Sequence, residues 1–262
     1  LLPHPSGQGW IVLIPRALRE GSRHGAQAAA AFFGDEDDPA SCGHFRSLLI
    51  EPQHDGYSHL KGVGALARHY AERCGLSPSL VDIVARAGDG HDLGKADPRF
   101  QSWLRNGVPW VTGPLLAKSA ELPQGRQQNL DARERAGYPA GGRHELLSVR
   151  LLESHPHALP ADRELRDLLL HLVESHHGHC RPFAPVIVDG NPLTVNVEVD
   201  GLALRANTDT GLDRIDAGPA DRFWRLTQRF GWWGIAWLEC LLRLADHRRS
   251  ELEQQRTRRE AA

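Results

Sequence analysis

The chain has 262 residues, enough to bury a substantial core as one large domain or as a domain with an extension. Its 31 basic and 33 acidic side chains give a formal net charge of -2, which excludes a global cationic field, so any attraction to nucleic acid must come from local patches. The four cysteines form no C-x-x-C pair, which excludes a zinc ribbon and a disulfide framework and predicts a cytoplasmic location.

No apolar run is long enough to span a bilayer, and the first residues do not form a signal peptide, so we expect no membrane partner. The sequence contains no methionine, not even at position 1. Because a natural chain needs an initiator, we expect this sequence to be a piece of a longer polypeptide.

The first 55 residues predict a connector or N-terminal extension. They contain a short strand-like run at 10–14 and an acidic loop at 34–39. From residue 57 the pattern turns helical, because apolar residues recur at three- and four-residue spacing. Further helix starts are predicted at Ser77-Pro78 and at Asp97-Pro98, where a capping side chain precedes a proline.

The middle of the chain gives a weaker signal. Residues 118–135 are polar and contain proline and glycine, so we expect a mostly exposed excursion there. Helical pattern returns at His144, and another helix is predicted over about 160–177, with Gly178 as its C-terminal cap.

Between residues 182 and 206 the apolar period changes to two, which predicts a small β-hairpin or meander. Strand-like residues at 186–188 and alternating valines at 195–199 carry this signal. Two closing helices follow, the first beginning near Pro219. We therefore predict a mainly α-helical domain over 56–253, with a β insertion at about 183–206 and a polar tail at 254–262.

Five of the 15 histidines are predicted metal ligands because of where they lie. The adjacent pairs His91-Asp92 and His176-His177 can each serve two ions, since neighbouring side chains on a helix point about 100° apart. Buried imidazoles and carboxylates are costly without a partner, and a metal is an efficient one. The predicted ligands are His59, His91, Asp92, His144, His176, His177 and Asp246.

These nitrogen and oxygen donors, without thiolate, predict two divalent ions of Mn, Fe, Co or Ni, with Mg and Zn as alternatives. Two such cations with two carboxylates retain a charge of about +2, which matches an anionic phosphate and a hydroxide. One bridging carboxylate would hold the ions roughly 3.5–4 Å apart. The donor set therefore predicts a two-metal phosphodiesterase.

The motif at 91–95, His-Asp-Leu-Gly-Lys, followed by Phe100-Gln101, resembles the signature of the HD superfamily of metal-dependent phosphohydrolases. The wider ligand set, with Asp246-x-x-x-Ser250, is similar to the HD nuclease domain of the CRISPR-associated helicase–nuclease of type I systems. The resemblance covers about 57–250. The Trp-rich run at 231–234 resembles the subtype whose HD domain follows the helicase, which would account for a missing N-terminal portion.

The resemblance implies a division of the ligands between two ions. One ion would take His59, His91, Asp92 and Asp246. The other would take Asp92, His144, His176 and His177, so that Asp92 bridges. The resemblance also implies that Asp92 and Lys95 are catalytic, with Lys95 near the scissile phosphate. Ser250 would contact the strand, and its i, i+4 spacing places it on the same helix face as Asp246.

Other basic and aromatic residues are candidates for a nucleic-acid groove. With Ser250, we predict Arg143 and Arg181 as nucleic-acid-binding residues. The wider basic set is Lys61, Lys95, Lys118, Arg126, Arg143, Arg181, Arg248 and Arg249. Trp103, Trp110 and Phe183 are candidates for stacking on bases. Core packing is the expected role of Trp224, Trp233 and Trp237.

Gly88-Asp89-Gly90 precedes the His-Asp pair, where helix-forming residues are more usual. Two glycines cost about 1 kcal/mol each relative to alanine, so we expect a helix loosened at the site. Asp89 is expected to be an exposed carboxylate in a turn rather than a spare ligand.

The leading hypothesis is a nuclease in which a metal-bound hydroxide cleaves single-stranded DNA in antiviral defence. The resemblance implies two partners: a helicase portion of the same full-length protein and an RNA-guided surveillance complex. No phosphate-binding loop occurs, so this chain should not hydrolyse ATP. One alternative is an HD phosphohydrolase acting on nucleotides or cyclic nucleotides. Another is a catalytically weak binding domain stabilised by its metals.

Overall fold

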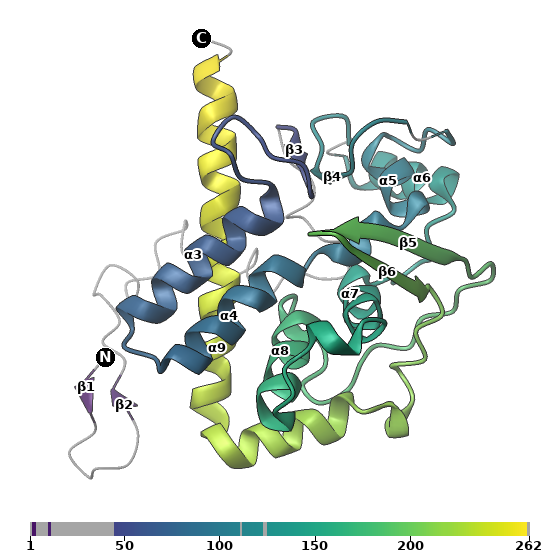
Figure 1. Ribbon diagram of the computed structural model, residues 1–262. Helices are drawn as coiled ribbons and strands as arrows, with labels where there is room; N and C mark the ends of the chain where they lie inside the picture. Colours follow the sequence, from purple (N-terminus) through teal and green to yellow (C-terminus); the bar gives the residue numbers. More distant parts are fainter. Residues whose placement is uncertain (1, 4–9, 12–44, 111, 123–124, 261–262) are drawn as a thin grey trace. The chain divides into compact units, whose positions relative to one another are not determined.

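The computed structural model describes residues 2–3, 10–11, 45–110, 112–122 and 125–260 (Figure 1). The chain divides into two compact units, Leu1–Pro39 and Ala40–Ala262. In the first unit, β1 (Leu2–Pro3) pairs antiparallel with β2 (Trp10–Ile11). The strand β2 begins the strand-like run expected at 10–14. The rest of that run and the acidic loop at 34–39 lie outside the described residues.

Helices dominate the second unit, so the prediction of a mainly α-helical fold is confirmed. Its α-helices are α3 (His59–Arg73), α4 (Pro78–Gly90), α5 (Pro98–Leu104), α6 (Arg126–Ala136), α7 (His144–Glu153), α8 (Arg163–Ser175) and α9 (Pro219–Glu260). Short 3-10 helices join some of them: η1 (Leu93–Ala96), η2 (Pro156–Ala158) and η3 (Ile215–Ala217). Among the described residues, no helix combines the length and the apolar character needed to cross a membrane.

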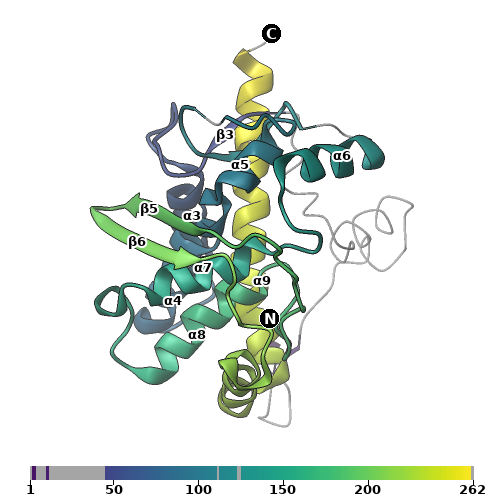
Figure 2. The same ribbon diagram turned by 90° about the vertical axis from the view of Figure 1, so that its right-hand side faces the viewer.

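The main core lies where α3 and α4 pack against α9, with α8 between α4, α7 and α9 (Figures 1 and 2). The helix α4 is intact through Gly90, so the expectation of a loosened helix is wrong. A Cβ at Gly88 would lie 2.8 Å from the Cα of Gly64, so glycine allows α3 and α4 to approach closely. Asp89 lies inside this helix rather than in a turn, and pairs with Lys61 at 3.1 Å.

Predicted helix starts agree with the structure. Proline follows the N-cap Ser77 of α4, and an Asp97 carboxylate oxygen caps α5 by accepting from the backbone N of Arg99 at 2.8 Å. Asp162 caps α8 in the same way, accepting from Leu165 N at 2.9 Å. Because this cap is at residue 162, α8 begins slightly later than the expected residue 160.

The predicted β insertion is a hairpin. β5 (Thr194–Val199) pairs antiparallel with β6 (Leu202–Asn207), joined by Asp200-Gly201, both with positive φ. Its buried valines pack towards α7 and η1. The strand-like residues at 186–188 form no strand, which corrects the meander alternative. They have no pairing partner, and Val186 and Val188 are exposed.

The excursion expected over 118–135 is mostly exposed among its described residues, but it contains regular structure. β4 (Leu116–Lys118) pairs with β3 (Ser47–Leu48), and the polar α6 follows. That helix packs through polar side chains: Asn129 Oδ1 accepts from Trp103 Nε1 at 2.9 Å, and the Arg133 guanidinium lies 5.1 Å from the Trp103 ring centroid. An apolar period therefore does not reveal this helix.

The two predicted closing helices form one long element, α9, interrupted at Gly231 (φ 71°, ψ 165°). Its second half continues through the predicted polar tail as far as Glu260. The expectation that Trp224 and Trp233 are core residues is wrong, since Trp233 is 88% exposed and Trp224 is also exposed. Trp237 does pack against the core.

Candidate metal centre

The seven predicted ligands come together within the second unit. They form two groups, and within each group one donor atom per residue lies within 4.8 Å of the others. We call them the His59 group (His59, His91, Asp246) and the His144 group (Asp92, His144, His176, His177). All are buried except His177, which is half-buried.

Most of these ligands lie at helix ends. His59 is the first residue of α3, after the N-cap Ser58, whose Oγ accepts from Lys61 N at 3.2 Å. His91 follows α4 directly, His144 opens α7, and His176 follows α8. Helix ends from distant parts of the sequence therefore meet at one place.

The glycine of the His-Asp-Leu-Gly-Lys motif allows this meeting. A Cβ at Gly94 would collide with the carbonyl oxygen of His144, so only glycine lets η1 lie against the start of α7. Ser148 joins the same segments: its Oγ accepts from Gly94 N at 2.8 Å and donates to His91 O at 2.7 Å. The sequence did not single out Ser148.

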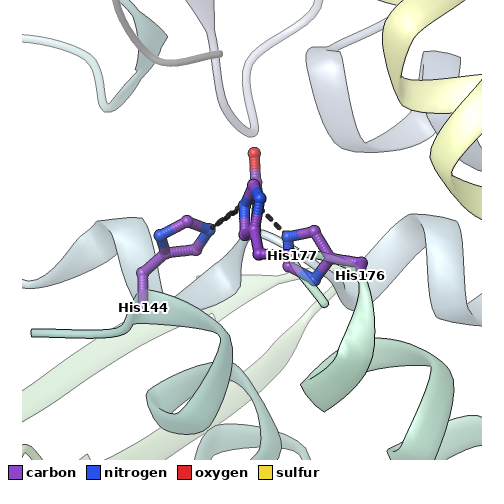
Figure 3. A group of neighbouring side chains, drawn as sticks. His144, His176 and His177 are labelled. Carbon is purple, nitrogen blue, oxygen red and sulfur yellow. Dashed lines mark hydrogen bonds and ion pairs between the residues drawn. The ribbon is translucent and has the colours of Figure 1, made fainter. Parts of the chain in front are cut away.

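In the His144 group, imidazoles surround one oxygen of Asp92. His144 Nε2 lies 2.9 Å and His176 Nε2 lies 3.6 Å from Asp92 Oδ1. His177 Nε2 lies 3.3 Å from His144 Nε2. Figure 3 shows the ring of His144, at the start of α7, beside the rings of His176 and His177, which follow α8.

The other oxygen of Asp92 faces the His59 group. His91 Nε2 lies 3.4 Å and His59 Nε2 lies 3.8 Å from Asp92 Oδ2. Asp246 Oδ1 lies 3.2 Å from His59 Nε2 and 4.0 Å from His91 Nε2. The Asp92 carboxylate therefore lies between the two groups, with one oxygen toward each.

Ring orientation fits metal binding. The Nδ1 atom of His91 contacts Gly88 O at 2.8 Å, and that of His176 contacts Val173 O at 2.7 Å. Nδ1 must donate to a carbonyl, so Nε2 keeps a free lone pair. The buried Nε2 atoms of His59, His91 and His176 have no hydrogen-bond partner among the described residues. Such orphaned acceptors suit a divalent cation.

Electrostatics keep the carboxylates ionised. Burial alone would raise the pKa of Asp92, but the surrounding imidazoles of His91, His144 and His176 and the Lys95 charge hold that pKa well below its usual range. Burial likewise opposes ionisation of Asp246, but the Lys118 charge and the neighbouring His59 and His91 imidazoles keep its pKa well below normal.

The surroundings of His91, in the His-Asp-Leu-Gly-Lys motif, favour its neutral form. Burial lowers the pKa of His91, although the neighbouring Asp92 carboxylate partly opposes that effect. A neutral imidazole is the form that binds a metal. Nearby carboxylates instead raise the pKa of His59 and of His176 against the effect of burial, so these two rings release a proton when a metal binds.

Lys95, predicted at the site, is buried beside it. Its Nζ lies 2.9 Å from Asp92 Oδ2 and donates to Ala117 O at 3.4 Å. Lys118, expected only as a groove residue, is 1% exposed and lowers the pKa of Asp246 through its charge. Lys118 lies in β4 at the start of a polar stretch, and nothing in the local sequence indicates that its charge acts on Asp246.

Two buried carboxylates were missed in the sequence. Glu145 is 0% exposed, and its Oε2 lies 3.8 Å from His144 Nδ1. Glu253 contacts His59 Nδ1 at 3.0 Å through Oε2. The seven-residue spacing from Asp246 to Glu253 places both on one face of α9, and this was the available signal.

The predicted nucleic-acid residues have different surroundings. Ser250 Oγ donates to Asp246 O at 2.9 Å and so lies beside the His59 group. Arg143, half-buried before His144, has no side-chain hydrogen bond or ion pair to any residue that the structure describes. Arg181 instead pairs with Glu239 Oε2 at 2.6 Å.

Most of the wider basic set is also engaged or covered. Lys61 pairs with Asp89 and with Asp200 at 2.6 Å, and Arg249 pairs with Glu253 at 2.7 Å. Among the stacking candidates, Trp103 is buried in the core, so its predicted contact with bases is wrong. Trp110 and Phe183 are exposed.

A helical domain whose helix ends gather imidazoles around a His-Asp dipeptide has the arrangement of the HD class of proteins. Comparison with protein families matches residues 63–198 to the family described as "Cas3, HD domain". The match covers more than half of the chain. The chain therefore belongs to this family, the HD-type metal-dependent nuclease domain of Cas3 in CRISPR type I systems. The resemblance expected from the sequence is confirmed.

The family implies a nucleic-acid substrate, divalent metal and an association with the CRISPR helicase machinery. No curated protein and no solved structure gives a significant match to the chain.

Proposed function

We propose that this domain cleaves single-stranded DNA with two divalent metal ions. The observation that carries the proposal is the Asp92 carboxylate, which turns Oδ1 toward the His144 group and Oδ2 toward the His59 group. A carboxylate with one oxygen toward each set of imidazoles is suited to bridge two cations.

The ligands divide accordingly. His59, His91, Asp92 and Asp246 would hold one ion, and Asp92, His144, His176 and His177 would hold the other. When bound, the ions supply a hydroxide nucleophile at neutral pH and Lewis-acid stabilisation of the developing phosphate charge. Oxygen and nitrogen ligands favour Mn, Fe, Co or Ni, with Mg or Zn as alternatives.

Three residues of the chain contact or orient the substrate in this proposal. Lys95 holds its ammonium 2.9 Å from Asp92, so it can fix the bridging carboxylate and face a phosphate oxygen beside it. Ser250 presents its hydroxyl on the face of α9 that carries Asp246. Arg143 offers a guanidinium without a described partner next to His144, suited to a backbone phosphate. Arg181 is already paired with Glu239, so we assign it a smaller part.

The exposed Trp110 and Phe183 remain candidates for stacking on unpaired bases, which favours a single strand over a duplex. In the full-length protein, a helicase portion would deliver the strand, and an RNA-guided surveillance complex would recruit the enzyme. The location in the cytoplasm follows from these partners.

One further cavity bears on the nucleotide alternative. It is lined by Arg99 and Arg143, but also by the carboxylates Asp97, Asp189, Asp209 and Asp213. More carboxylates than guanidiniums line it, which disfavours a nucleoside triphosphate. We therefore place the nuclease ahead of a nucleotide phosphohydrolase.

The test is Mn²⁺-dependent cleavage of a single-stranded oligonucleotide by the domain and by Asp92→Ala. We expect a loss of about 10³-fold or more in the variant. Asp82→Ala is the matched control, because Asp82 lies on α4 and pairs only with surface arginines among the described residues. Cleavage by Asp92→Ala at the wild-type rate would refute the proposal. Faster turnover of a dNTP or a cyclic dinucleotide than of the oligonucleotide would favour the phosphohydrolase.

A further inference from the structure

We propose that Glu253 is a positioning residue that prepares His59 to bind metal through Nε2. This inference rests on the metal centre of the proposed function. Glu253 belongs to neither ligand group, yet its side chain is only 5% exposed. A buried carboxylate is costly unless charged or hydrogen-bonding partners surround it, so its location calls for a role.

The carboxylate lies directly behind the His59 ring. Glu253 Oε2 is 3.0 Å and Oε1 is 3.3 Å from His59 Nδ1, whereas the opposite ring nitrogen, Nε2, is 3.2 Å from Asp246. An ionised carboxylate can only accept a hydrogen bond, and the Glu253 contacts at Nδ1 have hydrogen-bond geometry whereas the Asp246 contact at Nε2 does not, so the proton is held on Nδ1. Nε2 then keeps its lone pair on the side of Asp246 and Asp92. A carboxylate behind a ligating imidazole also increases its basicity toward a metal.

Glu253 is itself held in place from two directions. Arg249 Nε lies 2.7 Å from Glu253 Oε1, and Gln53 Nε2 donates to the same oxygen at 3.1 Å. Arg249 continues the chain of contacts by pairing with Asp55 and donating to Tyr57 O at 3.1 Å. The segment that precedes α3 is thereby tied to the last part of α9.

The sequence leaves room for this arrangement at Gly62. A Cβ at Gly62 would collide with the Arg249 side chain, so glycine in α3 lets the guanidinium pass to Glu253 and Asp55. Gly62 lies one turn after His59, so α3 supplies both the ligand and the opening for its support.

The other ligand rings are oriented differently. His91 and His176 donate from Nδ1 to carbonyls three residues earlier in their own segments, Gly88 O and Val173 O. Backbone carbonyls are present whatever the side chain. Of the three rings His59, His91 and His176, His59 is the one whose Nδ1 contacts an ionised side chain from another element. Its orientation therefore depends on one replaceable residue.

Calorimetric titration with Mn²⁺ tests the inference without a nuclease assay. We expect the wild-type domain to bind two ions, and Glu253→Ala to weaken one of them by about 10- to 100-fold while the other changes little. Glu253→Gln retains an acceptor oxygen, so we expect it to recover most of the lost affinity. Glu251→Ala is the matched control, since Glu251 lies exposed on the same helix and pairs with Arg248.

Long-range proton–nitrogen NMR of the metal-free protein at alkaline pH supplies a second readout. We expect His59 to be protonated on Nδ1 in the wild type and in Glu253→Gln, and to become a mixture of tautomers in Glu253→Ala. A variant that only loosened packing would not change this ratio in the one ring.

The outcomes separate the two claims. If Glu253→Ala binds each ion with the same affinity as the wild type does, the positioning role is overturned while the metal centre stays intact. A wild-type domain that binds no Mn²⁺ would refute the metal centre itself. The His59 tautomer would then test only whether Glu253 holds the proton on Nδ1. If Glu253→Ala fails to fold, Glu253→Gln decides: the Nε2-protonated tautomer in that variant contradicts the inference.

Discussion

The two halves of the metal centre use similar ligands but differ in what lies behind them. In the His59 group, His59 is fixed by Glu253 at 3.0 Å, and Glu253 in turn by Arg249 and Gln53. In the His144 group, Glu145 lies 3.8 Å from His144 Nδ1, beyond hydrogen-bond distance, and His177 is half-buried. The first half has a carboxylate hydrogen-bonded behind one of its ligands before any ion arrives, whereas the second has one ligand nearer to solvent. We expect the His59 group to bind its ion more tightly.

The largest expected effect comes from removing one ligand from each half. Asp246→Ala removes a buried anionic ligand from the supported half, and we expect cleavage of single-stranded DNA to fall about 10³-fold. His177→Ala removes a neutral, half-buried ligand from the other half, and we expect a loss of about 10²-fold. Rates measured at saturating Mn²⁺ check the order. A larger loss for His177→Ala would contradict the comparison.

The next largest expected effect is an increase in the free energy of unfolding when Mn²⁺ is added. At a Mn²⁺ concentration about 100 times Kd, one ion stabilises the folded state by about 2.7 kcal/mol. For a domain of this size, that raises Tm by about 5–10 °C. Calorimetric scans with Mn²⁺ and with EDTA measure the difference. In Asp246→Ala the increase should shrink but persist, because the His144 group remains. An unchanged Tm on addition of Mn²⁺ would show that neither half binds the ion.

An ion pair outside both halves provides a reference for stability. Hydrogen bonds from Arg99 lower the pKa of Asp189 to about 2, with burial opposing them. The folded pKa lies below the unfolded value, so this stabilisation is complete above about pH 4 and is lost as the pH falls toward 2. At neutral pH, Asp189→Asn should cost about 1–2 kcal/mol after allowance for solvent screening.

Urea denaturation of metal-free wild type and Asp189→Asn at several pH values tests this expectation. The difference in unfolding free energy should narrow as the pH falls below about 4. A difference that is constant with pH would show that Asp189 acts through packing rather than charge. Mn²⁺ affinity should be unchanged in this variant, because Asp189 contacts neither group.

The smallest effect is expected at Glu145. Its carboxylate does not reach hydrogen-bond distance of His144, so Glu145→Gln should weaken Mn²⁺ binding by the His144 group by only about threefold or less. The measurement compares this small loss of Mn²⁺ affinity with the larger loss expected for Glu253→Ala. Equal losses in the two variants would mean that both halves depend on their carboxylates to the same degree, and the comparison would fail.

Sequence alone predicted the helical class and all seven members of the two groups. That was possible because capping residues such as Asp97 act locally, and because the His-Asp-Leu-Gly-Lys motif ties ligands to a family pattern. Periodicity failed at α6, since its packing uses Asn129 and Arg133 rather than an apolar stripe. It also failed at Trp233, whose aromatic character says nothing about which face of α9 it occupies.

The site residues that the sequence analysis missed are brought to the ligands by tertiary packing. Glu253 matters because α9 passes beside His59, and only its seven-residue spacing from Asp246 signals this in the sequence. Lys118 matters because β4 passes beside Asp246, and no local pattern specifies that proximity. Part of the expected basic set is paired elsewhere for a similar reason. Lys61 and Arg249 are basic in sequence, but their charges are offset by acidic partners from distant segments.

The central claim is that Asp92 bridges two ions. Anomalous scattering at the manganese absorption edge, from crystals of the domain grown with Mn²⁺, tests it most directly. We predict two peaks roughly 3.5–4 Å apart, one beside His59, His91 and Asp246 and one beside His144, His176 and His177, with an Asp92 oxygen toward each. A single peak, or two peaks without Asp92 between them, would contradict the account.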